Sequence, residues 1–519
     1  MSLLPVLPIL LPFGAATIML LLGPGRLATQ RVLALGAGLG GLMVAAALLA
    51  GADAGVISAY RLGDWPAPYG IVMVVDRLAA MMLMLVAVLA LGALLMAMGG
   101  SDAERPDGRG RHFHALFQLQ LAGLAGAFLT GDLFNLFVFF EILLLASYAL
   151  MMHGPAPAEA ARVRAGLIYV VLNLVGSSLF LLALALTYAS LGTLNLADVA
   201  RLLAVLPADD VAMARTAMAL MAAVFLLKAA VLPMSLWLPQ VYARAPAAAA
   251  ALFVILTKVG IIMLLRLAVT GWGDSIATAG LLQPWLPVLA LGTITLGTIG
   301  AFAARRLAEV AAWLVLVSSG TLLFALGFLT PRGTAALLYY LPQSTLFCAA
   351  LFLLAGHVAA RRGALGDRLG RGPAASGRRW LLPAWGVAAV GLAGLPPLAG
   401  FLGKLMMLQA VGTGGWQGPW WGVLLLSSLG VLLVLSRATG PLFWQANEVP
   451  LDNRAALAGV AGVAPQMGLW LLLAAGVAMT VWAAPMSGFA GRTAEQLFER
   501  RAYQAAVLGD VPVQRERRP

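Results

Sequence analysis

Long apolar runs, separated by short polar, proline-rich or glycine-rich breaks, dominate the pattern of the chain. A helix needs about 20 apolar residues to cross a bilayer, and about fourteen runs approach or exceed that length. They lie at residues 3–23, 31–50, 72–98, 114–130, 133–152, 166–190, 213–238, 247–270, 284–303, 308–329, 335–359, 381–409, 419–436 and 467–485. The pattern therefore predicts an all-α polytopic membrane protein with about 14 transmembrane helices.

The connections between the runs leave no room for a separate domain. Only those at about 100–112, 361–379 and 438–466 are long. We therefore interpret residues 1–519 as a single transmembrane domain. Its end, residues 486–519, mixes charged with apolar side chains, which is typical of a short amphipathic helix on the membrane surface.

Composition strengthens this interpretation. The chain is 62% hydrophobic and 10% charged, with a mean hydropathy of +0.94, whereas soluble domains carry about a quarter charged residues. Most soluble enzyme classes are therefore excluded. The net charge of +12 comes mainly from arginines in loops, so it does not indicate a nucleic-acid partner. The single cysteine, Cys348, excludes an internal disulfide framework.

Arginines predict the orientation in the membrane. They concentrate in the odd-numbered connections, as in the pairs Arg305–Arg306 and Arg378–Arg379. Positive residues favour the cytoplasmic side, so we expect these connections to be cytoplasmic and both termini to lie outside. The C-terminal tail is also arginine-rich, on the side where the rule expects few. Either the tail escapes the rule, or the number of spans differs by one.

The lysines show the opposite distribution. Only three occur, Lys228, Lys258 and Lys404, and all lie inside apolar runs. A lysine at the bilayer centre costs about 2.5–3.5 kcal/mol even on lenient insertion scales. Arginine stays protonated at almost any depth, whereas a desolvated lysine can lose its proton. The pattern favours a proton relay; the alternatives are a static buried ion pair and, mainly for Lys404, a side chain that reaches the interface.

Glu141 is the acidic counterpart of these lysines, because it lies near the centre of its run. We expect a lysine on a neighbouring helix as its partner, and Lys228 fits best by depth. A pair that can join and separate could be switched by a passing proton or ion. A static bridge is the alternative interpretation.

Prolines predict two broken helices near these lysines. Pro233 and Pro239 follow Lys228 in the seventh run, and Pro396 and Pro397 precede the lysine of the twelfth. Discontinuous helices in the two halves of a chain indicate a transport site, since their free backbone groups can face ions or water. The order of break and lysine differs between the two runs, so these motifs alone do not demonstrate a repeat.

The remaining polar residues carry weaker signals. Asp76 and Asp132 open the third and fifth spans and could be groups at the entrance of an ion path or plain helix-end charges. The histidine spacings form no metal site, and no phosphate-binding loop, dinucleotide motif or haem or iron–sulfur cluster motif occurs. We therefore expect no metal and no cofactor. The chain must take its energy from an ion gradient or from a partner protein.

Five stretches resemble the antiporter-like subunits shared by multisubunit cation/proton antiporters and respiratory complex I, and most closely the D subunit of the Mrp (or Pha) antiporters. They are FLTGDLFNLFVFFEILLLASYALMMHG from Phe128, LLKAAVLPMSLWLPQVY from Leu226, LTKVG from Leu256, YYLPQSTLFCAALFLLAG from Tyr339 and GLPPLAGFLGKL from Gly394. The resemblance covers roughly residues 1–510.

The resemblance implies fourteen helices with two inverted five-helix repeats, at about 112–270 and 284–436, and broken helices seven and twelve. It also implies a hydrophilic axis through a glutamate on helix five and lysines on helices seven, eight and twelve, which match Glu141, Lys228, Lys258 and Lys404. Members work in the bacterial inner (plasma) membrane, in complexes of six or seven subunits. These complexes exchange Na⁺ or K⁺ for protons, driven by the proton motive force.

Two departures concern the second half. The tenth run opens with Arg305-Arg306-Leu307-Ala308-Glu309 and has no histidine, and Gln343 stands where related subunits often place one. A continuous proton path through this half would therefore need water.

Three alternatives remain at the level of sequence. They are the homologous subunit of complex I or a membrane hydrogenase, a membrane-embedded transferase acting on a lipid-linked substrate, and an assembly scaffold with frozen ion pairs. The sequence does not distinguish Na⁺ from K⁺, because it contains no readable cation cage.

Overall fold

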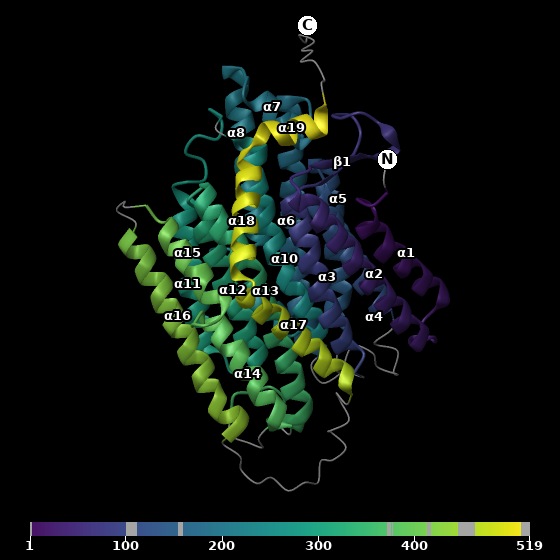
Figure 1. Cartoon of the computed structure of the whole chain (residues 1–519), viewed down its shortest axis with the longest axis vertical. Coiled ribbons are helices and arrows are strands. Elements are labelled where there is room, and N and C mark those ends of the chain that lie inside the picture. The colour runs from purple at the N-terminus through teal and green to yellow at the C-terminus, as the bar shows by residue number, and fades with distance from the viewer. Residues whose placement is uncertain are drawn as a thin grey trace.

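The computed structural model describes residues 3–99, 112–153, 159–273, 275–370, 375, 377–412, 417–444 and 462–509. These residues form a tall bundle in which most helices follow one long axis (Figure 1). Residues 100–111 and 445–461 of two predicted long connections, and residues 510–519 of the predicted tail, lie outside the described part.

The elements up to the middle of the chain include one small antiparallel hairpin between the second and third helices. They are α1 (Leu7–Leu22), α2 (Leu27–Asp53), β1 (Ser58–Arg61), β2 (Val72–Val75), α3 (Arg77–Ala97), α4 (Phe113–Leu129), α5 (Leu133–Met152), α6 (Glu159–Leu191), α7 (Leu196–Leu203), α8 (Val211–Lys228), α9 (Trp237–Tyr242) and α10 (Ala247–Arg266), which a π-helix, η4 (Leu267–Trp272), extends. The hairpin and the short amphipathic helix α7 were not among the predicted elements.

In the rest of the chain, the described elements are all helices. Its elements are α11 (Trp285–Ala303), α12 (Leu307–Leu326), α13 (Pro331–Arg361), α14 (Arg378–Ala393), α15 (Ala399–Ala410), α16 (Gln417–Thr439) with the π-helix η6 (Gly440–Trp444), α17 (Val463–Val481), α18 (Ala483–Phe498) and α19 (Arg500–Leu508). Single 3₁₀ turns occur at Leu62–Asp64, Ala208–Asp210 and Gly363–Leu365.

Every predicted apolar run contains a helix or a broken pair of helices, and the run at 72–98 also contains the strand β2. Within the described residues, eleven helices are long and apolar enough to cross a membrane, and α1 and α4 are shorter apolar helices. The all-α polytopic fold class is therefore confirmed. Burial distinguishes central from peripheral helices. All residues in the apolar stretch of α10 that could cross the membrane are buried, whereas only 22% of those in α2 are.

The two runs that were predicted to be broken, the seventh and the twelfth, are interrupted. α8 ends at Lys228, and the helix resumes only at Trp237 as α9. α14 ends at Ala393 and α15 begins at Ala399, with Pro396 and Pro397 between them. Proline removes a backbone donor and clashes with the preceding turn, which favours a break at these positions.

The C-terminal segment differs from the single surface helix predicted from residue 486. α18 packs along α13 and runs parallel to the bundle axis, while α19 lies across the end of the bundle near α7 (Figure 1). Ala490 and Ala494 are buried on α18, and small side chains let two helices approach closely. Residues 483–498 therefore belong to the bundle.

Candidate functional site

Glu141 and Lys228 flank the same helix, α6. The Ser177 hydroxyl donates a hydrogen bond to Glu141 Oε1, and Lys228 Nζ donates to Asn173 Oδ1 at 3.1 Å. Asn173 and Ser177 lie four residues apart, so they occupy the same face of α6. The Asn173 amide nitrogen donates to the Tyr169 carbonyl oxygen at 2.9 Å, which leaves Oδ1 free to face the lysine.

The glutamate and the lysine are separated, although their charges interact. No salt bridge joins Glu141 to Lys228 in the described part of the chain, but the two groups remain electrostatically coupled. Lys228 is only 5% exposed, and its Nζ lies 5.9 Å from the centroid of the Phe140 ring. The sequence predicted a pair that can join and separate. In the structure the two groups are separated, and the neutral Asn173 side chain contacts Lys228.

Aromatic side chains line the break beside Lys228. Trp237, the first residue of α9, stacks on Tyr169 with ring centroids 5.3 Å apart. The Tyr169 hydroxyl in turn lies 2.9 Å from the Ser147 hydroxyl of α5. The start of α9 is thus held against α6, where the Tyr169 ring packs on Trp237 and its hydroxyl bonds Ser147 of α5.

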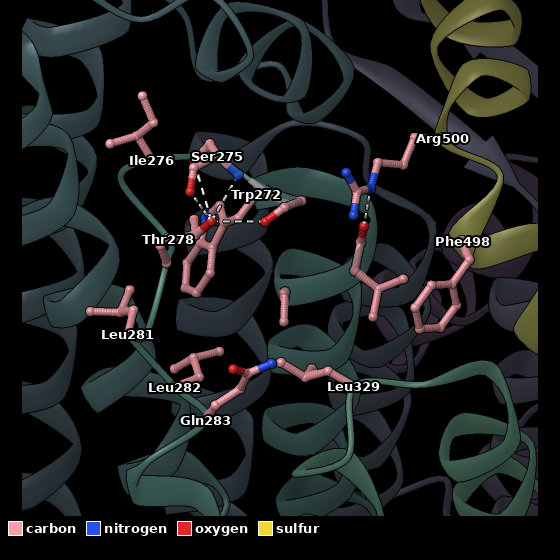
Figure 2. A pocket seen from close by; sticks show the side chains of 15 residues that line it. Trp272, Ser275, Ile276, Thr278, Leu281, Leu282, Gln283, Leu329, Phe498 and Arg500 are labelled. Carbon is pink, nitrogen blue, oxygen red and sulfur yellow. Dashed lines mark hydrogen bonds between the residues drawn. The ribbon is translucent and has the colours of Figure 1, made fainter. Parts of the chain in front are cut away.

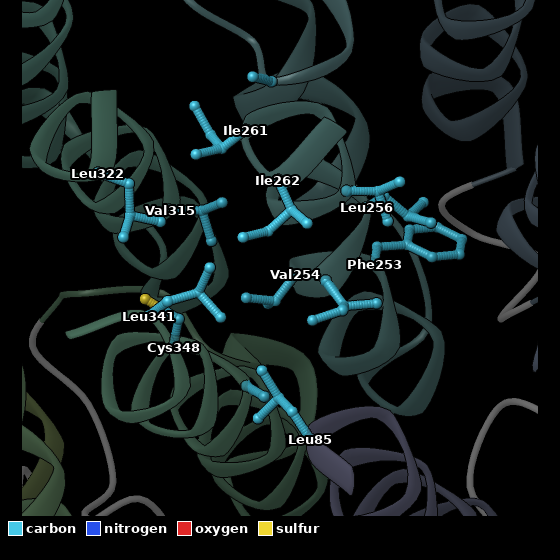
Figure 3. Close-up of a cluster of buried hydrophobic side chains, with 14 of the residues drawn as sticks. Leu85, Phe253, Val254, Leu256, Ile261, Ile262, Val315, Leu322, Leu341 and Cys348 are labelled. Carbon is cyan, nitrogen blue, oxygen red and sulfur yellow. The ribbon is translucent and has the colours of Figure 1, made fainter. Parts of the chain in front are cut away.

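Lys258 lies at the centre of the most buried helix and is 0% exposed. Its Nζ has no hydrogen-bond partner among the described residues, and its charge interacts with the thiol of Cys348 on α13. Figure 3 shows Val254 and Ile261, one turn to either side on α10, in an apolar cluster with Leu341 and Cys348. Apolar packing therefore surrounds this lysine, and the thiol is a polarizable neighbour.

Lys404 reaches back over the second break. Its Nζ donates to the Ala393 carbonyl oxygen at 3.0 Å and to the Ser428 hydroxyl at 2.7 Å. Ala393 is the last residue of α14, where backbone carbonyls lack helical partners and carry partial negative charge. Gly394 follows in the left-handed region, with φ 73°, and a Cβ there would lie 2.9 Å from Lys404 Nζ.

The two predicted aspartates have helix-end positions. Asp76 caps α3 and forms a two-pronged salt bridge with Arg266, at 2.7 and 2.9 Å, in which both side chains are buried. Burial raises the pKa of the neighbouring Tyr503 to about 12, so its hydroxyl stays neutral beside this pair. Asp132 caps α5 by accepting from the Asn135 amide at 2.8 Å.

A wide cavity of ≈ 580 Å³ opens at one end of α10, away from the buried lysines. Figure 2 shows Trp272, Thr278 and Arg500 around it, with the Thr278 hydroxyl bonded within its own turn. None of Glu141 and the three lysines lines this cavity. Its size alone does not make it the functional site.

Several contacts of the site were not singled out from the sequence. Asn173, Ser177 and Ser428 are the neutral partners of Lys228, Glu141 and Lys404 respectively. A signal was present, because Asn173 and Ser177 interrupt an apolar run at helical spacing. Among the described residues, no group of three His, Cys, Asp or Glu side chains is arranged to hold a metal.

Known proteins resemble this chain over almost its full length. It is 37% identical to a protein of Rhizobium meliloti (strain 1021) named as the probable D subunit of a K(+)/H(+) antiporter, over 97% of each chain. It is 32% identical to the D subunit of the Na(+)/H(+) antiporter of Bacillus subtilis (strain 168), over 97% of this chain and 99% of the relative.

Solved structures show the same similarity in fold. A chain of the Mrp complex from Dietzia sp. DQ12-45-1b aligns with a TM-score of 0.83 and 25% identity, covering 98% of this chain and all of that one. A chain of respiratory complex I from Thermus thermophilus shares the fold, with a TM-score of 0.76 and 23% identity over 95% and 99% of the two chains. Residues 130–433 match the family described as NADH:quinone oxidoreductase/Mrp antiporter, TM. The chain therefore belongs to this family, and its similarity to antiporter D subunits extends over nearly its whole length.

Proposed function

We propose that the chain is the proton-translocating subunit of a multisubunit monovalent cation/proton antiporter, driven by the proton motive force. The names of its relatives include both Na⁺ and K⁺ antiporters, so either cation or both are candidates for exchange. The helical spans and the family indicate a multi-pass protein of the bacterial inner membrane. The chain is then a transporter subunit rather than an enzyme, and the two inverted repeats remain a prediction.

One observation carries the proposal: two of the three buried lysines, Lys228 and Lys404, have neutral partners, whereas the buried Arg266 has a carboxylate. Arg266 is fixed by two hydrogen bonds to Asp76. Lys228 instead donates to an amide oxygen, and Lys404 donates to a carbonyl and a hydroxyl. An amine donates hydrogen bonds in both of its protonation states, so these contacts survive loss of a proton, whereas a salt bridge does not.

The same reasoning applies to Glu141. A hydroxyl such as that of Ser177 can donate to a carboxylate or accept from a carboxylic acid, so the contact persists when Glu141 is protonated. The charges of Glu141 and Lys228 interact, so a proton arriving at one changes the preferred charge of the other. We infer that this exchange drives protons along the axis from Glu141 through Lys228 and Lys258 to Lys404.

Glu141 also faces the outside of the bundle. It is half-buried on the face of α5 that carries Phe134, Val138 and Leu145, and Leu145 is 71% exposed. A charged side chain in contact with lipid is costly. We infer that a neighbouring subunit or a wet space between subunits covers this face, as a six- or seven-subunit complex would provide.

The test uses inverted vesicles from cells that lack their own antiporters. The chain is expressed with its neighbouring subunits, and a pH-gradient dye reports proton movement when Na⁺ and then K⁺ is added. We expect cation-dependent dequenching, lost in Glu141→Gln and retained in the matched Glu495→Gln, whose glutamate is exposed on α18.

The outcomes separate the candidate functions. A response to one cation alone names the substrate. An assembled wild-type complex without any response would contradict the proposal and favour a redox-driven complex, whose subunits share this fold. A normal response in Glu141→Gln would leave antiport in place but exclude Glu141 from the proton path.

A further inference from the structure

The wide cavity at the end of α10 has side chains of opposite character on its two sides. Its volume of ≈ 580 Å³ lies in the range of pockets that hold small organic molecules. Figure 2 shows Ser275 and Arg500 on one side, and Leu282, Leu329 and the amide of Gln283 on the other. A ligand that fills the cavity therefore needs a strongly polar part and a largely apolar part.

The cavity lies at the depth of the membrane surface. The span that contains α10 ends at Trp272, and the next span begins at Trp285, which is 65% exposed. The connection that lines the cavity therefore joins two span ends. Tryptophan is enriched at this depth, where the lipid headgroups meet the hydrocarbon.

The helices beside the cavity expose apolar side chains. Val288 on α11 and Met486 on α18 are exposed, as is Ile276 in the cavity wall itself. In a membrane protein such side chains can contact lipid chains without loss, because both are apolar. An acyl chain can therefore pass from the cavity into the bilayer along these faces.

Arg500 places a guanidinium in the polar wall. Its Nε donates to the Val269 carbonyl oxygen at 2.7 Å, and a Cβ at Gly273 would collide with the guanidinium, so the group packs directly on the end of η4. A guanidinium presents a planar fork of N–H donors that matches the oxygens of a phosphate. Because the group is already held in place, little ordering is needed when a ligand binds.

We propose that this cavity binds one phospholipid, with the phosphate at Arg500 and the acyl chains toward Leu282, Leu329 and the exposed faces of α11 and α18. The Gln283 amide can donate to an ester carbonyl of the lipid, which lies between the phosphate and the chains. Inorganic phosphate has the same polar chemistry but leaves the apolar wall uncovered. The bound lipid would connect η4 to both C-terminal helices, and this role goes beyond the proposed transport and does not depend on it.

The test measures lipid binding to the assembled complex. The complex is purified in detergent, and dioleoyl phosphatidylglycerol or dioleoyl phosphatidylethanolamine is added back. Native mass spectrometry gives the dissociation constant of the most tightly bound lipid. A parallel series contains inorganic phosphate as a competitor, which separates a lipid site from a site for a free anion.

Two variants change the two requirements of the site. Arg500→Gln removes the guanidinium, and Ala268→Phe fills the cavity from η4 while it leaves Arg500 unchanged. We expect each variant to weaken binding of the lipid on the order of tenfold, which corresponds to about 1.4 kcal/mol. The second variant keeps the test decisive if loss of Arg500 loosens α19.

Matched controls make the same changes outside the cavity. Arg501→Gln removes an exposed arginine of the same helix, and Ala212→Phe adds a ring at an exposed position of α8; neither residue lines the cavity. Both should bind lipid like the wild type.

The results that overturn the site are specific. A wild-type complex that retains no phospholipid would show that something else, such as a neighbouring subunit, covers the cavity. Equal binding in Ala268→Phe and Ala212→Phe would place the lipid elsewhere. Displacement of the lipid by inorganic phosphate alone would assign the site to a free anion. Transport is not measured in any of these steps, so a failure of the proposed antiport leaves the lipid site standing.

Discussion

Ser177 and Asn173 show how single neutral residues can place a charge without fixing its protonation state. Ser177 donates to Glu141, and Asn173 accepts from Lys228. A direct contact between the two charged groups would favour one charged state of both. The intervening side chains keep the charges near enough to interact and far enough apart to change separately.

The hydroxyl of Ser177 can be removed with an adjacent control. Ser177→Ala deletes the donor to Glu141, and a hydrogen bond to a charged group contributes about 1.5–3 kcal/mol. We expect proton movement in vesicles to fall on the order of tenfold. Ser178→Ala should have little effect, because the Ser178 hydroxyl is exposed and bonds only the Leu174 carbonyl of its own helix. Equal rates in the two variants would show that the Glu141 contact does not serve transport.

At the scale of elements, the two breaks place their lysines differently. Lys228 is the last residue of α8 and precedes its break, whereas Lys404 lies inside α15 and reaches back to α14. Lys404 Nζ therefore lies at the C-terminal end of α14, where unpaired carbonyls favour a cation. Lys228 Nζ instead contacts the Asn173 side chain within α6, so the two lysines have different local surroundings.

Gly394 is the position at which the second break is most sensitive. Its φ is positive, and a Cβ would lie 2.9 Å from Lys404 Nζ, so Gly394→Ala combines backbone strain of about 1–2 kcal/mol with a displaced lysine. We expect a lower melting temperature of the purified complex and several-fold slower proton movement. Gly386→Ala on the same helix meets no atom within 4 Å and should be neutral or slightly stabilising. A neutral Gly394→Ala would contradict the importance of this contact.

Long apolar runs and prolines in the sequence predicted the spanning elements well, whereas segments of mixed composition did not predict where their helices pack. The apolar runs and the proline positions indicated every spanning element, because each depends on long local signals. A helix was predicted at α18, but on the membrane surface, because the helix carries Ala, Gly, Arg and Glu and only its packing on α13 decides its place. The partners of the lysines depend on side-chain contacts between helices, which spacing along one chain does not contain.

For the whole molecule, the C-terminal helices connect distant parts of the chain at one end of the bundle. The Leu497 carbonyl of α18 accepts from Thr270, and Arg500 of α19 donates to the Val269 carbonyl at 2.7 Å, both on the π-helix that ends the Lys258 helix. Tyr503 is buried beside Arg266 and Asp76. The start of α3, the end of α10 and the C-terminal helices are thus held as one unit.

The buried pair in this unit should dominate its stability. Arg266→Ala leaves Asp76 buried without its partner, and breaking a buried pair in this way costs about 3–5 kcal/mol. An exposed pair serves as the control. Arg492 of α18 and Asp53 of α2 form a salt bridge in which each side chain is 46% exposed. Exposed pairs contribute about 0.2–1 kcal/mol. We therefore expect Arg266→Ala to lower markedly the temperature at which half of the purified complex disassembles, and Arg492→Ala to lower it only slightly.

Because the pair lies far from the lysines along α10, any Arg266→Ala complex that assembles at low temperature should still transport protons. Loss of transport in such a complex would instead place Asp76 and Arg266 on the ion path.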